Sequence, residues 1–213
     1  MPLFEVRRGL GAGFGSGASP AAAMSTTGHL VMMNFYQAMV LDGRGYTVRA
    51  GTISVPLVGD VLITDTAAEM CADAAANTTI MPMFANISFN LAAATLFETA
   101  GKSVATVSSA GTAFVPLPLK SNGSAAVSTA RVQAAGAVTV TAEVATTTPR
   151  HFSWGHPIAA GAWPTIYQWG PLAAPVLVGP RCFYIQIGAD TTGPSYYANV
   201  DYIEVPTLMV DPS

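Results

Sequence analysis

Charge is scarce in this sequence. Nine Lys and Arg and twelve Asp and Glu make up 10% of the 213 residues, whereas hydrophobic residues make up 51%. Soluble domains carry about 25% charged residues, and a folded chain of 21.9 kDa exposes roughly 9,300 Å². Ala, Thr, Ser and Gly must therefore cover most of this surface. A surface with so few charges and so many small, weakly polar residues predicts a protein that neighbouring subunits cover.

Further absences exclude whole classes of function. The net charge is −3 and the basic residues are scattered singly apart from Arg7-Arg8, so no specific nucleic-acid partner is expected. No run reaches 18 apolar residues, which argues against a membrane helix. The longest candidate, Leu30 to Leu41, is short and contains Asn34 and Gln37. The segment after Arg7-Arg8 is too weakly apolar for an export signal.

The chain has only two cysteines, Cys71 and Cys182, which lie far apart in sequence. Neither belongs to a CxxC motif or has a Cys or His neighbour at a metal-ligand spacing. We expect buried free thiols, because isolated cysteines in a chain of this length behave as small apolar residues. A disulfide in an oxidising compartment stays open as the alternative.

No catalytic constellation is evident. Ser153 lies between His151 and His156, but there is no G-x-S-x-G elbow and no orienting carboxylate nearby. His151 and His156 are five residues apart, which is not a recognised ligand spacing. No phosphate-binding loop is present. The sequence therefore predicts a protein that is not an enzyme and holds no cofactor, with a hydrolase of unknown type as a remote alternative.

Two regions follow from the backbone chemistry. Residues 1–28 contain alternating glycines and small residues, and such a segment cannot bury enough apolar area to offset its backbone entropy. We expect an extended arm held by neighbouring molecules, with an arm that lies along its own domain as the alternative. Residues 29–213 read as one domain of short β-strands separated by turns. The predicted fold is all-β, an antiparallel β-sandwich (jelly-roll-like) with one short helix and the extended N-terminal arm.

Several elements can be placed within this domain. The Asp42-Gly43 pair predicts a hairpin between His29–Leu41 and Tyr46–Leu57. The short helix is expected at Thr66–Ala76, which opens with a capping-box spacing. In that helix Asp65, Glu69 and Asp73 would share one face, which we expect to be solvated, with a cation site as the less favoured alternative.

The second half of the domain is expected to continue as hairpins. These are Ala94–Glu98 with Val104–Ser108, Ala125–Ala134 with Ala137–Ala145, and a closing pair Cys182–Gly188 with Tyr196–Val205. Pro116 and Pro118 demote Ala113–Leu119 to an edge strand.

Residues 151–180 differ from the rest of the domain. This stretch contains no charged side chain, all three tryptophans and five prolines. Because the prolines interrupt regular structure, we expect a long loop with a short strand at Ile166–Gln168. The aromatic rings fit a protein interface or a plug for one end of the sandwich. A sugar-stacking site, as in a carbohydrate-binding module or fibre head using Trp154, Trp163 and Trp169, is the alternative.

Taken together, the Met1–Gly28 arm, the run from Gly51 to Leu57 and the closing strands Cys182–Val205 resemble the capsid decoration (cement) proteins of tailed bacteriophages. The resemblance implies a jelly-roll-like homo-trimer that decorates and stabilises a capsid. Its partners would be the major capsid protein or other shell subunits. The protein would lie on the virion surface after assembly in the host cytoplasm. The residues expected at the partner interface are Phe4, Arg7, Arg8, Leu10, Phe14, Trp154, Trp163, Tyr167 and Trp169.

Overall fold

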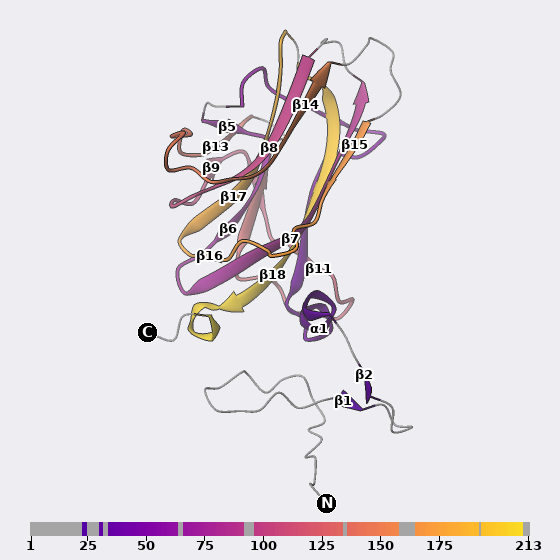
Figure 1. The fold of residues 1–213 in the computed structure, drawn as a ribbon, viewed down its shortest axis with the longest axis vertical. Coiled ribbons are helices and arrows are strands. Elements are labelled where there is room, and N and C mark those ends of the chain that lie inside the picture. The colour runs from indigo at the N-terminus through magenta and orange to yellow at the C-terminus, as the bar shows by residue number, and fades with distance from the viewer. Residues whose placement is uncertain are drawn as a thin grey trace, which may run out of the picture.

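The computed structural model shows two antiparallel sheets packed face to face (Figure 1). The six-stranded sheet has the order β10-β12-β6-β17-β8-β14, and the seven-stranded sheet contains the path β11-β3-β18-β7-β15, with β4 and β16 attached to it. The predicted all-β sandwich is confirmed. The structure describes residues 23–24, 30–31, 34–63, 66–91, 96–133, 136–157, 165–191 and 193–210.

The strands of the six-stranded sheet are β6 (Met70–Ala74), β8 (Leu96–Val104), β10 (Thr112–Phe114), β12 (Thr129–Val132), β14 (Arg150–Pro157) and β17 (Arg181–Ala189). Those of the seven-stranded sheet are β3 (Gly45–Ala50), β4 (Leu57–Val58), β7 (Thr78–Leu91), β11 (Leu117–Pro118), β15 (Thr165–Trp169), β16 (Leu177–Val178) and β18 (Ser195–Pro206). A third sheet joins β5 (Ala67–Ala68), β13 (Val138–Thr139) and β9 (Ser109–Ala110), and β1 (Ala23–Met24) pairs with β2 (Leu30–Val31). The helices are α1 (Phe35–Leu41) and the 3-10 turn η1 (Thr207–Met209).

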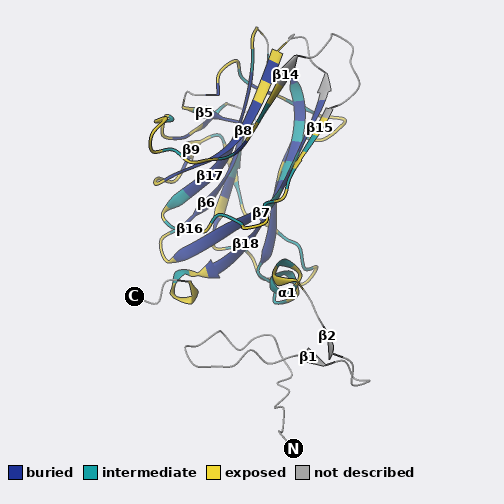
Figure 2. Cartoon of the chain, in the orientation of Figure 1, coloured by how far each residue is buried: buried dark blue, intermediate teal, exposed yellow. Residues whose placement is uncertain are grey.

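The main core lies between the two large sheets, where the buried strands of Figure 2 face each other. A second, smaller core lies on the outer face of the six-stranded sheet. There Cys71, Cys182 and Tyr184 pack with Val138 of the three-stranded sheet and with Val140, which directly follows β13. Covered on both faces, β17 is buried along nearly its whole length, whereas β18 alternates buried and half-buried residues. The domain therefore has three layers rather than two.

The one helix is not where the sequence predicts it. Residues 67–74 form β5 and β6 instead of a helix, and α1 replaces the strand expected at His29–Leu41. Asn34 begins α1, its Oδ1 accepting a hydrogen bond from the Gln37 amide at 2.7 Å. Asp42-Gly43 does form a turn, but this turn ends α1 instead of joining two strands, with Gly43 at φ +82°.

The predicted carboxylate face at Asp65, Glu69 and Asp73 is also wrong. Glu69 and Asp73 are buried among strands rather than solvated, and Asp65 lies outside the described residues. Small alanines at positions 72 and 74 let β6 fit between two layers, and this packing overrides their helix propensity. A capping box and a run of alanines could not reveal that burial.

Three predicted hairpins are wrong in their pairing. The closing strands β17 and β18 belong to different large sheets, so the segment between them crosses the sandwich. Residues 99–102 are the middle of the continuous strand β8 instead of a turn. Strands β12 and β13 likewise lie in different sheets. Val138 and Val140 are buried and Thr139 and Thr141 exposed, but this alternation does not continue, because Ala142 is exposed and the Glu143 side chain is only 7% exposed.

The predicted edge strand Ala113–Leu119 is confirmed as an edge, but it divides into two strands. β10 closes one end of the six-stranded sheet and β11 closes one end of the seven-stranded sheet. The chain passes from one sheet to the other through Val115-Pro116, so it seals this side of the sandwich. Pro116 and Pro118 lack the N–H donors that would let another strand pair here.

Gly101 provides a test of packing in the main core. A Cβ atom at this position would lie 2.2 Å from the Phe152 ring on the neighbouring strand. We expect Gly101→Ala to lower the free energy of unfolding by about 1 to 3 kcal/mol through overpacking, measured by urea denaturation. Gly136→Ala is the matched control, since no heavy atom lies within 4 Å of its new Cβ. Equal stability of the two variants would contradict this packing.

Candidate functional site: an aromatic seam and an apolar exterior

The second side of the sandwich is closed by side chains rather than by the backbone. Strand β14 ends the six-stranded sheet and β15 ends the seven-stranded sheet, and both run along the same side of the molecule (Figure 1). Residues 151–157 thus belong to an edge strand, not to the predicted loop, whereas the strand predicted at Ile166–Gln168 is confirmed as β15. We call the aromatic rings between these two strands the aromatic seam. It consists of Phe152, Trp154, Tyr167, Trp169 and Phe183.

The rings of the seam stack on one another. Trp154 and Tyr167 are nearly parallel, with centroids 5.1 Å apart and an interplanar angle of 5°. Trp154 also stacks on Phe152 at 4.6 Å and 27°. Trp169 stacks on Phe183 of the core strand β17 at 6.0 Å and 17°. These contacts join the two sheets across their open side.

This geometry favours the plug interpretation over the sugar site. Trp154, Tyr167 and Trp169 are half-buried and pack against the main core. Ring surface that a sugar would need at Trp154 is engaged by Phe152 and Tyr167. The seam therefore gives little support to a carbohydrate-binding module or fibre head.

The predicted interface residues divide into two groups. The structure brings Trp154, Tyr167 and Trp169 together in the seam. Trp163 and the arm residues Phe4, Arg7, Arg8, Leu10 and Phe14 lie outside the described residues. Sequence reasoning missed Phe152, although its alternation with Trp154 is the period-two signal of a strand.

His151 and Ser153 do not form a reactive pair. His151 Nε2 lies 3.0 Å from Ser103 Oγ, and burial lowers the pKa of the imidazole. Its ring packs 5.7 Å from that of Phe183. Ser153 is exposed on the edge strand. The histidine is thus accounted for by packing at the margin of the seam.

Both strands that flank the seam have a free edge. Among the described residues, β14 pairs only with β8, and β15 only with β7. Arg150 is the one charged residue in these two strands. Natural edge strands are usually protected by charges, prolines or covering segments. Among the described residues of β14 and β15, the protecting features are Arg150, an irregularity beside it and the terminal Pro157.

Buried ion pairing uses some of the few charges. Lys102 is 0% exposed, and its ammonium group contacts the Ile63 carbonyl, Glu143 Oε2 and, at 2.8 Å, Gln186 Oε1. Arg150 donates to Glu143 Oε1 and Oε2 at 2.7 and 2.8 Å. These contacts lower the pKa of Glu143, with the Arg150 hydrogen bonds the largest cause. One of only two lysines is therefore removed from the surface.

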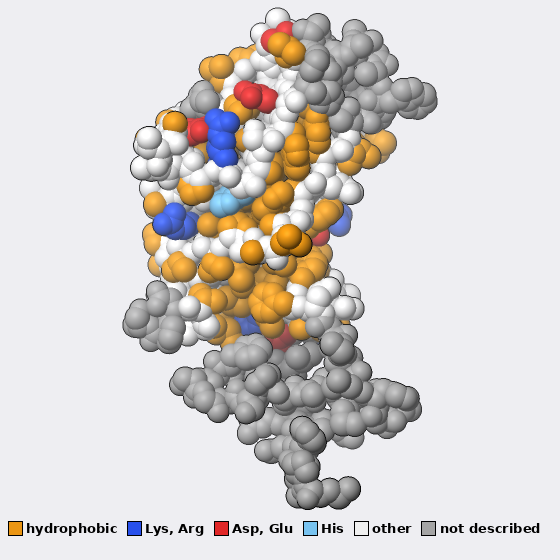
Figure 3. Space-filling model, in the orientation of Figure 1, with side chains coloured by type: hydrophobic (Ala, Val, Ile, Leu, Met, Phe, Trp, Pro, Cys, Tyr) orange, Lys and Arg blue, Asp and Glu red, His pale blue; other side chains and the backbone are white. Residues whose placement is uncertain are grey.

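The exterior of the protein is correspondingly rich in apolar side chains. Hydrophobic side chains spread over the face seen in Figure 3, and Lys, Arg, Asp and Glu appear at isolated points. The exposed large hydrophobic residues include Phe35, Leu41, Ile53, Val55, Val58, Val61, Leu62, Leu96, Val107, Val115, Leu117, Val127, Val144, Ile166, Leu172, Val176, Leu208, Met209 and Val210. Scattered single residues of this type are normal, but several here are grouped along the chain.

The strongest group lies on the turn Thr52–Val55, which follows β3. The turn is held by backbone hydrogen bonds in both directions between Thr52 and Val55, at 2.9 and 3.2 Å. Thr52 Oγ1 accepts a third hydrogen bond from the Val55 amide at 3.0 Å. The turn leaves Ile53 70% and Val55 67% exposed. An ordered turn that presents two aliphatic side chains to water is typical of a contact surface.

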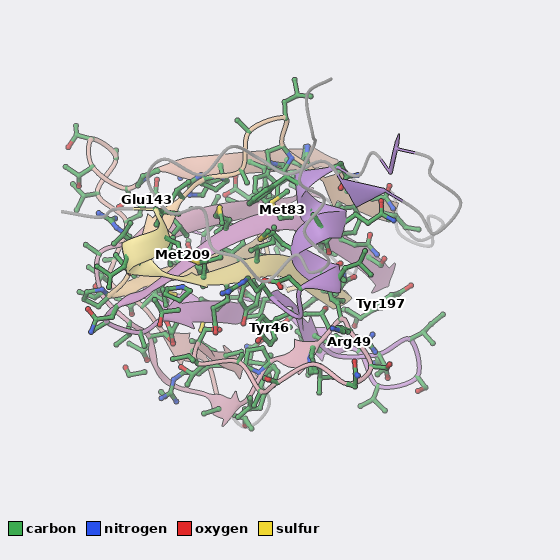
Figure 4. All side chains as sticks on the ribbon, turned by 90° about the horizontal axis from the view of Figure 1, so that it is seen from below. Tyr46, Arg49, Met83, Glu143, Tyr197 and Met209 are labelled. Carbon is green, nitrogen blue, oxygen red and sulfur yellow. The ribbon has the colours of Figure 1, made fainter. Side chains whose placement is uncertain are left out.

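A second group lies at the end of the sandwich that carries α1 and the chain's last turn (Figure 4). Phe35, Leu208 and Met209 are exposed there. Met83 lies beside α1 in this view and packs on the small cluster of Met81, Ile203 and Val205. Arg49 on β3 and Tyr197 on β18 lie on the neighbouring part of the seven-stranded sheet.

Within the part of the chain that the structure describes, no helix has the length and apolar character needed to cross a membrane. Comparison with protein-family models, with curated proteins and with solved structures gave no match for this chain. The class that the fold and site define is an antiparallel β-sandwich with an aromatic seam and an apolar exterior.

Proposed function

We propose that this protein is a structural subunit of a larger assembly, in which other copies and shell subunits cover its apolar exterior. The observation that carries the proposal is the ordered turn Thr52–Val55, which holds Ile53 and Val55 out in water. Burying aliphatic surface contributes about 25 cal/mol per Å². A turn that is already ordered loses little further entropy on binding.

The setting we propose is a virion. The subunit forms a trimer that decorates and stabilises a capsid, as the decoration proteins of tailed bacteriophages do, and it acts by binding rather than by catalysis. The low charge of the whole chain and the spread of exposed aliphatic residues support this setting. In this setting residues 1–28 act as an arm that ties neighbouring capsomers together, and several weak contacts on one trimer add through effective concentration.

The test is the oligomeric state of the purified full-length protein. We expect a trimer by light scattering coupled to size-exclusion chromatography. The double variant Ile53→Asp and Val55→Asp should dissociate it, because two carboxylates would be desolvated in the contact. At least about a hundredfold weaker association is expected, which corresponds to about 3 kcal/mol.

The matched control introduces two carboxylates elsewhere. Thr146→Asp and Thr147→Asp lie on an exposed turn and should leave the trimer intact. Circular dichroism checks that both double variants stay folded. A wild-type protein that is monomeric at all accessible concentrations would contradict the proposal, as would a trimer that both double variants retain.

A further inference from the structure

A cluster of three metal-ligating side chains lies in the second core. Cys71 Sγ, a carboxylate oxygen of Asp73 and Cys182 Sγ all lie within 4.8 Å of one another. All three residues are buried, and both thiols are free. Two thiols and a carboxylate are ligand types that zinc accepts in proteins.

Strand pairing holds these three side chains together. Cys71 and Asp73 are two residues apart on β6, so they point to the same face of the sheet. Cys182 on β17 is the direct partner of Asp73 in the β17–β6 register. Three ligands on two adjacent strands form a rigid arrangement, which favours a defined coordination geometry. This arrangement cannot be seen in the sequence, because 108 residues lie between Asp73 and Cys182 along the chain, although the two are neighbours in the sheet.

The Ser108 hydroxyl places a fourth potential ligand atom beside the cluster. Its hydroxyl lies 2.6 Å from Asp73 Oδ2 and 2.9 Å from Cys71 Sγ, and its amide donates to Asp73 Oδ1 at 2.9 Å. Tetrahedral zinc, with bonds of about 2.0 to 2.3 Å, spaces its ligand atoms by roughly 3.3 to 3.8 Å. Cys71 Sγ and Asp73 Oδ2 already lie 3.8 Å apart.

Two residues that pair with Cys71 in the sheet each have a buried polar atom without a hydrogen-bond partner. The Tyr184 hydroxyl is buried without a hydrogen bond, and Tyr184 is the direct partner of Cys71 across the β17–β6 pair. Arg131 is the partner of Cys71 across the β12–β6 pair, and its buried Nε also has no hydrogen-bond partner. With two thiolates, one carboxylate and Arg131, a divalent cation would bring the local charge to zero.

We propose that Cys71, Asp73 and Cys182 bind one zinc ion, with the Ser108 hydroxyl next to the fourth coordination position. Binding replaces the proton of each thiol by a bond to zinc and releases both protons to solvent. All three ligands lie on strands of the six-stranded sheet, so the metal would be linked to the three-stranded sheet only through Ser108, which directly precedes β9. This inference stands apart from the proposed function, because it concerns the interior of one chain.

The test is the metal content of the full-length protein. The protein is purified under reducing conditions, and zinc is measured by inductively coupled plasma mass spectrometry. It is also refolded with Co²⁺, whose thiolate complexes absorb in the near ultraviolet. We expect one zinc per chain and cobalt–thiolate absorption. Cys71→Ser and Cys182→Ser should each weaken the affinity at least about tenfold, measured by competition with a chromophoric chelator.

Val138→Ala is the matched control, because it shortens a buried side chain of the same small core without removing a ligand. It should keep the metal even if it loses stability, which separates ligand loss from general destabilisation. Two outcomes would overturn the proposal. One is a folded protein that holds no zinc as purified and binds neither metal after refolding. The other is metal binding that both cysteine variants retain.

Discussion

Replacing Lys102 by Met should lower the free energy of unfolding by about 3 to 5 kcal/mol. Lys102 is wholly buried, and its ammonium group contacts the Ile63 carbonyl, Glu143 and Gln186. The variant leaves these acceptors without their donor and leaves Glu143 with only Arg150 to compensate its charge. Urea denaturation of the two proteins at equal concentration measures the difference.

The chain supplies a matched control for this experiment. Lys120 is the only other lysine and is partly exposed in a turn, so Lys120→Met should change stability by no more than about 0.5 kcal/mol. Adding Glu143→Leu to Lys102→Met should recover part of the loss, because the buried carboxylate then disappears together with its partner. Equal stability of the two lysine variants would show that the buried pair contributes nothing.

The three-layer arrangement explains why this lysine is buried. Lys102 lies on β8, on the outer face of the six-stranded sheet, and a two-layer sandwich would leave that face in water. Glu143 follows β13, and the loop residue Ile63 precedes β5, so two of the three acceptors come from the covering layer, while Gln186 lies on β17 of the same sheet as Lys102. The charge network thus ties the third layer to the sandwich at one place. The Cys71, Asp73 and Cys182 cluster lies beneath the same layer.

The sequence predicts the class of fold but not its pairing. The prolines at 116 and 118 are a local signal, and the structure confirms the sheet edge that they predict. Whether two consecutive strands form a hairpin or cross between sheets depends on non-local contacts, which turn residues do not encode. The segment between β17 and β18 is rich in turn formers, yet it joins two different sheets.

The candidate site shows the same division. The absence of charge in residues 151–180 correctly marks Trp154, Tyr167 and Trp169 as an aromatic group, and the structure brings them together. The edge strand β14 is missed because prolines elsewhere in the stretch obscure the alternation of Phe152 and Trp154. The buried cluster at Cys71 and Cys182 is missed because its spacing exists only across the β6–β17 pair.

The stability of the protein should fall as the pH rises from about 4.5 to about 8, because of Glu69. This carboxyl group is 1% exposed and accepts hydrogen bonds from the amides of Asp60 at 3.0 Å and Ile187 at 2.8 Å. Desolvation outweighs these bonds and raises the pKa of Glu69 from 4.5 to about 8. Between those pH values the folded chain keeps a proton that the unfolded chain has lost, so raising the pH favours unfolding.

Comparison with Glu69→Gln isolates this effect. The shift corresponds to about 3 to 5 kcal/mol across the window, and the variant should lose that slope. It should also lose about 1 to 3 kcal/mol at low pH, because its amide –NH₂ would face one of the two backbone N–H donors.

The lowered pKa of His151 makes stability rise with pH below about 6.5, but this contribution is common to both proteins and cancels in the difference. Urea denaturation at fixed protein concentration between pH 4.5 and 8.5 measures both curves. Parallel curves would mean that Glu69 is ionised in the folded protein throughout, with its two backbone donors sufficient to hold the charge.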